Sequence, residues 1–78
     1  MTIKDLWLKT TFTGMWNIFE EGSKKETIIK ADETIGVMTD RDNPNHYLSE
    51  KEVKYFDVLP HPYYDNELVM RVCYEKGE

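Results

Sequence analysis

The chain has 78 residues, of which 40% are hydrophobic and 13% aromatic, and its formal net charge is −5 at pH 7. This length limits the fold to one domain, residues 1–78, with a small core, and the apolar content excludes a disordered chain. The negative charge argues against direct binding to nucleic acid or to an anionic membrane, because both require a basic surface.

Cysteine content and hydropathy indicate the compartment. The single cysteine, Cys73, excludes an intramolecular disulfide, whereas small secreted domains usually depend on disulfides. No apolar run approaches the roughly 20 residues that span a bilayer, and the first residues lack the pattern of a signal peptide. We therefore expect a cytoplasmic protein that makes no contact with a membrane.

The start of the chain predicts a short helix. Thr2 is placed to cap it, with Asp5 three residues later in the position of a capping-box acid. Ile3, Leu6 and Trp7 have the i, i+3, i+4 spacing of one apolar stripe. A helix this short is marginal in isolation, so we expect it to pack on a sheet.

Residues 10–22 change to a period of two and are rich in β-branched and aromatic side chains, which favours a strand. Gly14 within this segment indicates a bulge or the close approach of another backbone. Gly22 provides the following turn, and residues 26–31 predict the return strand of a hairpin. Within 31–39 we expect a further short strand, although the pattern there is ambiguous.

The next segment is dense in turn formers at 40–45. The sequence SEKE follows, in which Ser49 and Glu52 fit a capping box and predict a helical turn. Residues 53–59, VKYFDVL, carry apolar side chains of both parities, which predicts a central strand.

Residues 67–75, ELVMRVCYE, show the clearest alternation in the chain. One parity is apolar and should face the core together with Leu6, Trp16 and Ile18; its members are Leu68, Met70, Val72 and Tyr74. The elements together predict an α+β fold. We expect a short N-terminal helix packed on a small, mainly antiparallel, twisted sheet of four to five strands.

Acidic and histidine side chains near residue 40 raise the question of a metal site. An EF-hand loop that begins at Asp40 places Pro44 at its fifth position and lacks both the required glycine and the final glutamate. The set Asp40, Asp42, His46 and the distant His61 has no known zinc-motif spacing. We expect neither a metal nor a cofactor.

Catalytic motifs are also missing from the sequence. It contains no glycine-rich phosphate loop, no G-x-S-x-G motif and no C-x-x-C motif. A domain of this size also has difficulty enclosing a pocket of several hundred Å³. We therefore expect a protein without catalytic residues that is not an enzyme. One alternative stays open, a small enzyme or ligand-binding protein that uses His46 and His61.

The two proline-containing loops, 40–48 and 60–66, carry aromatic residues that a small core does not need. Proline restricts a loop and lowers the entropy cost of presenting a side chain, and tyrosine is enriched at protein interfaces. We place the candidate interaction surface on these loops and the adjoining sheet edge. Its residues are His46, Tyr47, His61, Tyr63 and Tyr64.

The surroundings of these loops suggest the partner. Asp40, Asp42 and Asp65 would form a charged rim suited to a basic protein. A small sheet also has two edges, and an unprotected edge can pair with a partner or with a second copy of the chain. We expect a protein partner, basic in one version of the hypothesis, or self-association through a sheet edge.

Three stretches, MTIKDLW, LSEKEVKYFDVL and NELVMRVCY, resemble small uncharacterised accessory proteins of phages, prophages and other mobile elements in Gram-positive bacteria. The resemblance covers under half of the chain and implies an accessory protein that acts on a host protein. The main hypothesis is therefore a non-enzymatic protein-interaction module. An alternative is an acidic inhibitor that mimics nucleic acid and blocks a host nuclease or defence system, although lysines are interspersed among its acids.

Overall fold

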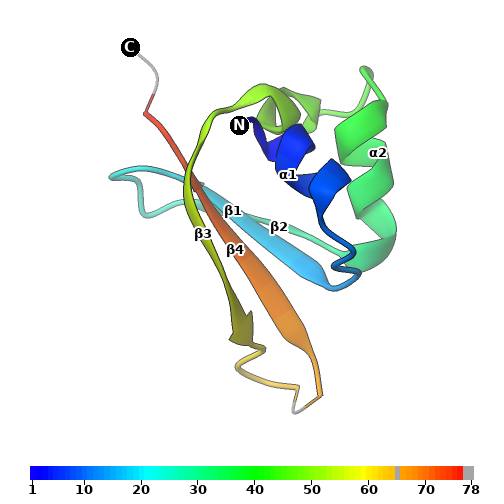
Figure 1. The fold of residues 1–78 in the computed structure, drawn as a ribbon, viewed down its shortest axis with the longest axis vertical. Helices are drawn as coiled ribbons and strands as arrows, with labels where there is room; N and C mark the ends of the chain where they lie inside the picture. The colour runs from blue at the N-terminus through cyan, green and yellow to red at the C-terminus, as the bar shows by residue number, and fades with distance from the viewer. Residues whose placement is uncertain (65, 77–78) are drawn as a thin grey trace.

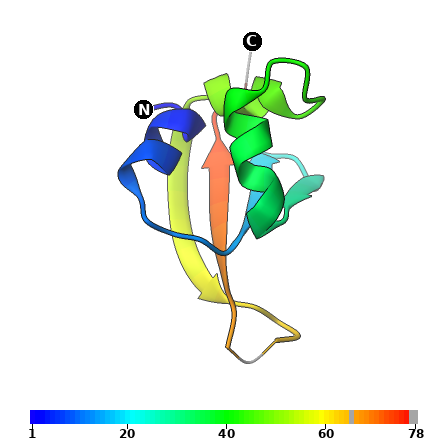
Figure 2. The same ribbon diagram turned by 90° about the vertical axis from the view of Figure 1, so that its right-hand side faces the viewer.

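The computed structural model describes residues 1–64 and 66–76 and places helices on one face of a four-stranded sheet (Figures 1 and 2). This arrangement confirms the expected α+β class. The elements in chain order are α1 (Ile3–Lys9), β1 (Met15–Glu20), β2 (Glu26–Ile29), the 3₁₀ helix η1 (Ala31–Glu33), α2 (Thr34–Thr39), the 3₁₀ helix η2 (His46–Glu50), β3 (Val53–Pro60) and β4 (Leu68–Tyr74).

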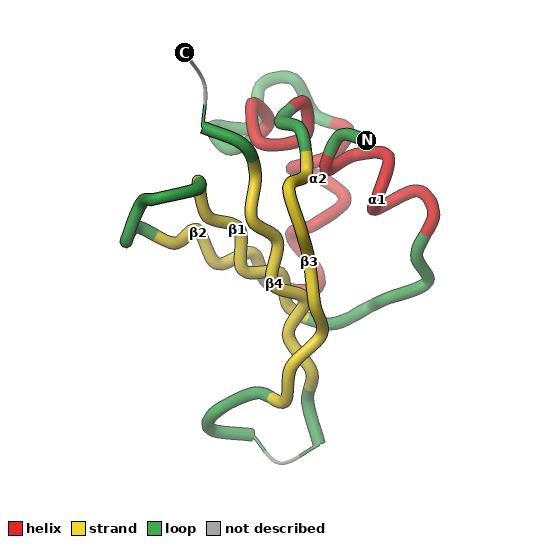
Figure 3. Tube along the Cα trace, turned by 60° about the vertical axis from the view of Figure 1, so that its left-hand side comes forward, coloured by secondary structure: helices red, strands yellow, loops and turns green. Residues whose placement is uncertain are grey.

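The strand order in the sheet is β2-β1-β4-β3. β1 pairs antiparallel with β2 and parallel with β4, and β4 pairs antiparallel with β3. The sheet is therefore mixed and mainly antiparallel, and it is twisted, as Figure 3 shows. The prediction that residues 53–59 form a central strand was wrong, because β4 takes the position beside β1 and leaves β3 at the edge.

The first helix begins as its sequence predicts. The hydroxyl Oγ1 of Thr2 accepts a hydrogen bond from the Asp5 N–H at 3.1 Å, and Oδ2 of Asp5 accepts one from the Thr2 N–H at 3.0 Å. The hydrogen bond from the Thr2 N–H favours the ionised carboxylate and lowers the pKa of Asp5. Ile3 and Leu6 are buried against the sheet, with Trp7 half-buried beside them.

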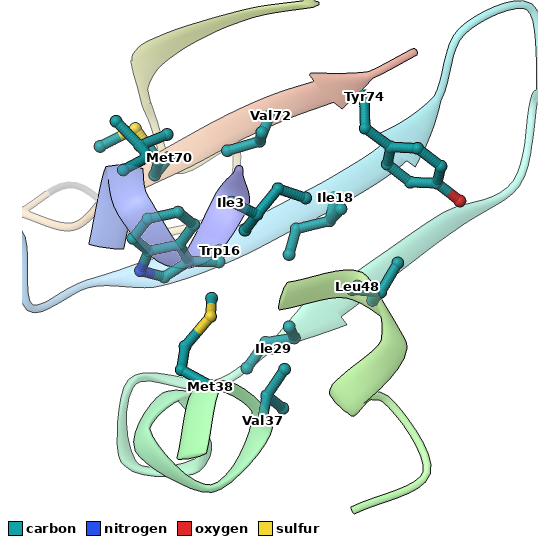
Figure 4. Packing of buried hydrophobic residues seen from close by; sticks show 11 residues of the cluster. Ile3, Trp16, Ile18, Ile29, Val37, Met38, Leu48, Met70, Val72 and Tyr74 are labelled. Carbon is teal, nitrogen blue, oxygen red and sulfur yellow. The ribbon is translucent and has the colours of Figure 1, made fainter. Parts of the chain in front are cut away.

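The core fills the space between the helices and one face of the sheet (Figure 4). Three of the four residues expected from β4 lie in it, whereas Leu68 is exposed because its end of the strand extends past the helices. Core residues come from every helix and strand except η1 and β3 and are Ile3, Leu6, Trp16, Ile18, Ile29, Val37, Met38, Leu48, Met70, Val72 and Tyr74.

Residues 31–39 form η1 and α2, so the strand expected there was wrong. Thr34, Val37 and Met38 are buried and lie at i, i+3 and i+4, which is the period of a helix. Ile35 lies off this stripe and is exposed. The apolar residues of this segment therefore follow the face of a helix that covers the sheet.

Gly14 confirms the expected close approach of another backbone. A Cβ atom at this position would lie 2.7 Å from the carbonyl oxygen of Leu68 and 2.5 Å from the ring of Phe12. Phe12 itself packs on Trp16, with ring centroids 6.3 Å apart. Residues 10–14 thus form a tight connection from α1, and the strand begins later than expected, at Met15.

Candidate protein-interaction surface

The end of β3, the start of β4 and the described residues between them form a hairpin, residues 55–64 and 66–70, that projects beyond the rest of the sheet (Figures 1 and 3). We call it the arm. Among the described residues, twelve large hydrophobic side chains are exposed, and seven of them belong to the arm. These seven are Tyr55, Phe56, Val58, Leu59, Tyr63, Tyr64 and Leu68. Exposed apolar side chains are thus concentrated on this one element.

The tip of the arm is an aromatic cluster built around His61. The His61 N–H donates to the Glu67 carbonyl at 2.9 Å and closes the hairpin. Nδ1 of His61 accepts from the Tyr63 N–H at 3.0 Å, and the His61 ring centroid lies 4.7 Å from that of Tyr64. Tyr63 is 85% exposed and Tyr64 is 59% exposed. His61 therefore orders two tyrosines that project into solvent.

His46 and Tyr47 lie in η2, at the opposite end of the molecule's 38 Å long axis (Figure 1). Nδ1 of His46 is 2.8 Å from the carbonyl oxygen of Val37, which can only accept, so the ring donates and fastens η2 to α2. Tyr47 is exposed, with the Lys51 ammonium 6.0 Å from its ring centroid. The structure therefore brings together His61, Tyr63 and Tyr64, and it separates them from His46 and Tyr47.

The stretch 40–45 is a series of hydrogen-bonded turns. Oδ1 of Asp40 accepts from the Asp42 N–H at 3.0 Å, and Oδ1 of Asn43 accepts from the Asn45 N–H at 2.9 Å. Within residues 1–64 and 66–76, no group of three His, Cys, Asp or Glu side chains could hold a metal ion. Of the expected acidic rim, Asp40 and Asp42 lie near η2, and Asp65 lies outside the described residues.

The capping box predicted at Ser49 and Glu52 was wrong. The helical turn lies at His46–Glu50, and Ser49 is buried inside it, where its hydroxyl donates to the His46 carbonyl at 2.7 Å. Glu52 instead pairs with the N-terminal ammonium of Met1 at 3.2 Å.

β3 has a free edge on the side away from β4. Because the His61 N–H donates to the Glu67 carbonyl, the alternation of the ladder directs the backbone N–H and C=O groups of Tyr55, Asp57 and Leu59 towards β4. The N–H and C=O groups of the intervening Phe56 and Val58 therefore point away from the sheet. The proline and the internal charges of residues 53–60 indicate an edge strand, a signal that the prediction of a central strand overlooked.

The free part of this edge has clear limits. At its start, the Val53 N–H donates to the Met1 carbonyl and the Ile3 N–H donates to the Lys51 carbonyl, each at 2.9 Å, so the N-terminal residues already occupy the edge there. At its end, Pro60 has no N–H to offer. The edge that can accept another strand is therefore residues 54–60.

One carboxylate on this edge has no ion-pair partner in the described part of the chain. The two ion pairs found there join Met1 to Glu52 and Lys54 to Glu21. Asp57 is exposed and lies opposite Arg71 in the sheet register, but the Arg71 guanidinium lies over the Phe19 ring, 5.1 Å from its centroid. Asp57 thus presents a free negative charge at the middle of the free edge.

An open groove of about 810 Å³ lies between the connection at residues 10–14 and the helix-facing side of the arm. Val58, Leu68 and Met70 line it from the arm, and Lys30 and Glu67 are the charged residues among its described lining. The groove is open rather than enclosed, and neither histidine lines it.

Cys73 is a free cysteine that is buried in β4. No helix in the described part of the chain has both the length and the apolar character needed to cross a membrane. No protein-family model, curated protein or solved structure matches this chain.

Proposed function

We propose that this chain is a non-enzymatic protein-interaction module that binds its partner with the arm. The observation that carries the proposal is the concentration of exposed aromatic and aliphatic side chains on one projecting hairpin. Exposed apolar side chains gathered on one part of a soluble protein mark an interaction site. The tip supplies tyrosines, which offer a large contact area at a low entropy cost.

The alternatives receive less support from the geometry. A catalytic pair of His46 and His61 would have to act from opposite ends of the molecule, and the ring of His46 already holds η2 against α2. A nucleic-acid mimic requires an array of free carboxylates, whereas the exposed residues of the arm are mainly aromatic and aliphatic. The resemblance to accessory proteins of mobile elements adds a host protein as the proposed partner.

The test compares two ends of the molecule. The tagged chain captures its partner from a host lysate, mass spectrometry identifies that protein, and the affinity is then measured with purified components. We expect the double variant Tyr63→Ala, Tyr64→Ala to bind at least about tenfold more weakly, because aromatic anchors dominate interface energetics. Tyr47→Ala is the matched control, since Tyr47 is 52% exposed but lies in η2.

The melting temperature separates binding from folding. The two tip tyrosines are mostly exposed, so the double variant should melt close to the wild-type protein. Unchanged binding by a normally folded double variant would place the interaction surface elsewhere. A large drop in melting temperature would instead show that these rings stabilise the fold.

A further inference from the structure

We propose that the free edge of β3 accepts an extended segment of the partner as an added antiparallel strand, and that Asp57 selects a segment with Lys or Arg opposite to it. This inference rests on the proposed function and names the chemistry of the partner. The site is the edge at residues 54–60, which continues directly into the aromatic tip of the arm.

The backbone of the edge is ready to pair. Phe56 and Val58 each direct an N–H and a C=O away from β4, because the hydrogen-bonded pairs of the β3–β4 ladder fall on the alternate residues. An incoming strand can therefore form hydrogen bonds with both residues, while Asp57 lies between them at a non-hydrogen-bonded position. Side chains of opposing strands approach most closely at such positions.

The other edge of the sheet is a poorer template. β2 contains four residues, begins with Glu26 and is followed by Lys30. Short edge strands and flanking charges are the usual protection against pairing. β3 contains eight residues and exposes large apolar side chains on both of its faces.

The negative charge on the free edge favours a basic partner segment over an acidic one. Lys54 is already paired with Glu21, so the uncompensated charge of the free edge is the carboxylate of Asp57. The chain as a whole carries a net charge of −5, which also favours a basic partner. An opposite charge directly across the strand pair is stabilising, whereas a like charge is destabilising.

A second copy of the chain fits this edge badly in the three two-fold registers that are centred on the middle of the edge, residues 56–58, and keep both helix layers on one side. Centring the pair on Asp57 gives the best hydrogen bonding but places two carboxylates directly opposite each other. Centring it on Phe56 requires the space beside Val53 that Met1 occupies. Centring it on Val58 leaves the two carboxylates as diagonal neighbours and sets Pro60, which has no N–H, at a bonding position.

The preferred segment follows from the alternation of side chains. The residue opposite Asp57 lies on the face of the sheet away from the helices and should be Lys or Arg. Its two neighbours lie on the helix-facing side with the exposed rings and methyl groups of Phe56 and Val58, so they should be apolar. The expected pattern in the partner is apolar, basic, apolar.

The first experiment uses two synthetic peptides that differ in one residue. One alternates valine and threonine around a central lysine, and the other has glutamate in place of the lysine. Each is titrated into ¹⁵N-labelled protein by NMR. We expect the lysine peptide to shift and protect the amides of Phe56 and Val58, and the glutamate peptide to bind about tenfold more weakly. Equal binding, or shifts confined to other residues, would overturn the proposal.

The second experiment changes the protein. Val58→Pro removes an outward N–H that β4 does not use, whereas Val58→Ala keeps it and is the matched control. We expect the proline variant to lose the lysine peptide and the alanine variant to retain it. Asp57→Lys should reverse the preference between the two peptides, and it keeps the proposal testable even if Val58→Pro fails to fold. Failure of that reversal would contradict the role of Asp57.

The third experiment addresses the second copy. By sedimentation, the wild-type protein should remain a monomer, while Asp57→Asn, which relieves the repulsion at the best register, should self-associate. A wild-type dimer with protected Phe56 and Val58 amides would overturn the choice of occupant. If the edge variants bind the purified partner normally while the tip variant Tyr63→Ala, Tyr64→Ala does not, this inference fails and the proposed function stands. Normal binding by both would remove the proposed function as well.

Discussion

Truncating Ile18 and Met70 to alanine removes the same number of heavy atoms from two different surroundings. Ile18 is 1% exposed and lies on β1 beneath the helices, and Met70 is 3% exposed and lies on β4 (Figure 4). Met70 also lines the open groove, whereas Ile18 does not. The two variants should therefore differ in stability for a reason that depends on the surroundings alone.

The magnitudes follow from the lost contacts. Removing three methylene-sized groups from the core costs about 2.4 kcal/mol at about 0.8 kcal/mol each. At position 18, a residual cavity of about 60 Å³ adds about 1.5 kcal/mol at about 24 cal/mol per Å³. At position 70, solvent and groove side chains can fill the space, so this second contribution is small. We expect losses of about 4 kcal/mol for Ile18→Ala and about 2.5 kcal/mol for Met70→Ala.

Urea denaturation measures both losses, followed by the fluorescence of the buried Trp16 and by far-ultraviolet circular dichroism. The slope of the unfolding free energy with urea should stay the same, so that the midpoint reports stability. A loss below about 0.5 kcal/mol for Met70→Ala, which is the scale of a surface change, would contradict its place in the core. Equal losses in the two variants would contradict the effect of the groove.

Three further predictions concern single positions. Gly14→Ala should lower the free energy of unfolding, measured by urea denaturation, by about 1–3 kcal/mol because the added Cβ meets a backbone carbonyl of β4. Gly36→Ala is the control: its Cβ meets only a side-chain nitrogen at 3.4 Å, so this variant should be as stable as the wild type or more stable. The capping hydrogen bond from the Thr2 N–H lowers the pKa of Asp5, so the ionised Asp5 carboxylate should stabilise the folded state above pH of about 3.9. This stabilisation should be lost as the pH falls through the folded pKa, and the free energies of unfolding of Asp5→Asn and wild type should therefore converge in strong acid. Calorimetric titration with calcium, zinc and manganese should show no micromolar binding at residues 40–52, where Oδ1 of Asp40 already accepts a backbone hydrogen bond, and a stoichiometric zinc site would contradict this.

Local chemistry made part of the fold predictable. The hydrogen bonds between Thr2 and Asp5 span three residues, and a strand's alternation needs only its own sequence, so α1 and β4 could be recognised early. Residues 31–39 were harder because helix and strand periods fit short apolar runs about equally well. The sheet order had no local signal, since it depends on which distant strand reaches the position beside β1.

The sequence also predicted some features of the candidate site and not others. Two adjacent tyrosines on a loop restricted by prolines suggested a surface role for Tyr63 and Tyr64 but left open that one of them covers the core, and the structure shows both exposed. The role of His46 could not be predicted, because its partner is the carbonyl of Val37 on a helix that the sequence did not predict. The separation of the two loops, in contrast, could have been predicted, because the strand expected at 53–59 connects them and places them at its opposite ends.

The wrong position for β3 has a physical cause that bears on function. Apolar side chains of both parities normally mean that a strand is covered on both faces, and this pattern predicted a central strand. In the monomer, β3 instead lies at the edge with Tyr55, Phe56, Val58 and Leu59 exposed. A strand with the composition of an internal strand and the position of an edge strand gains burial if another strand is added beside it. The same residues that misled the sequence interpretation therefore support the proposed pairing, in which β3 becomes internal once the partner's segment has bound.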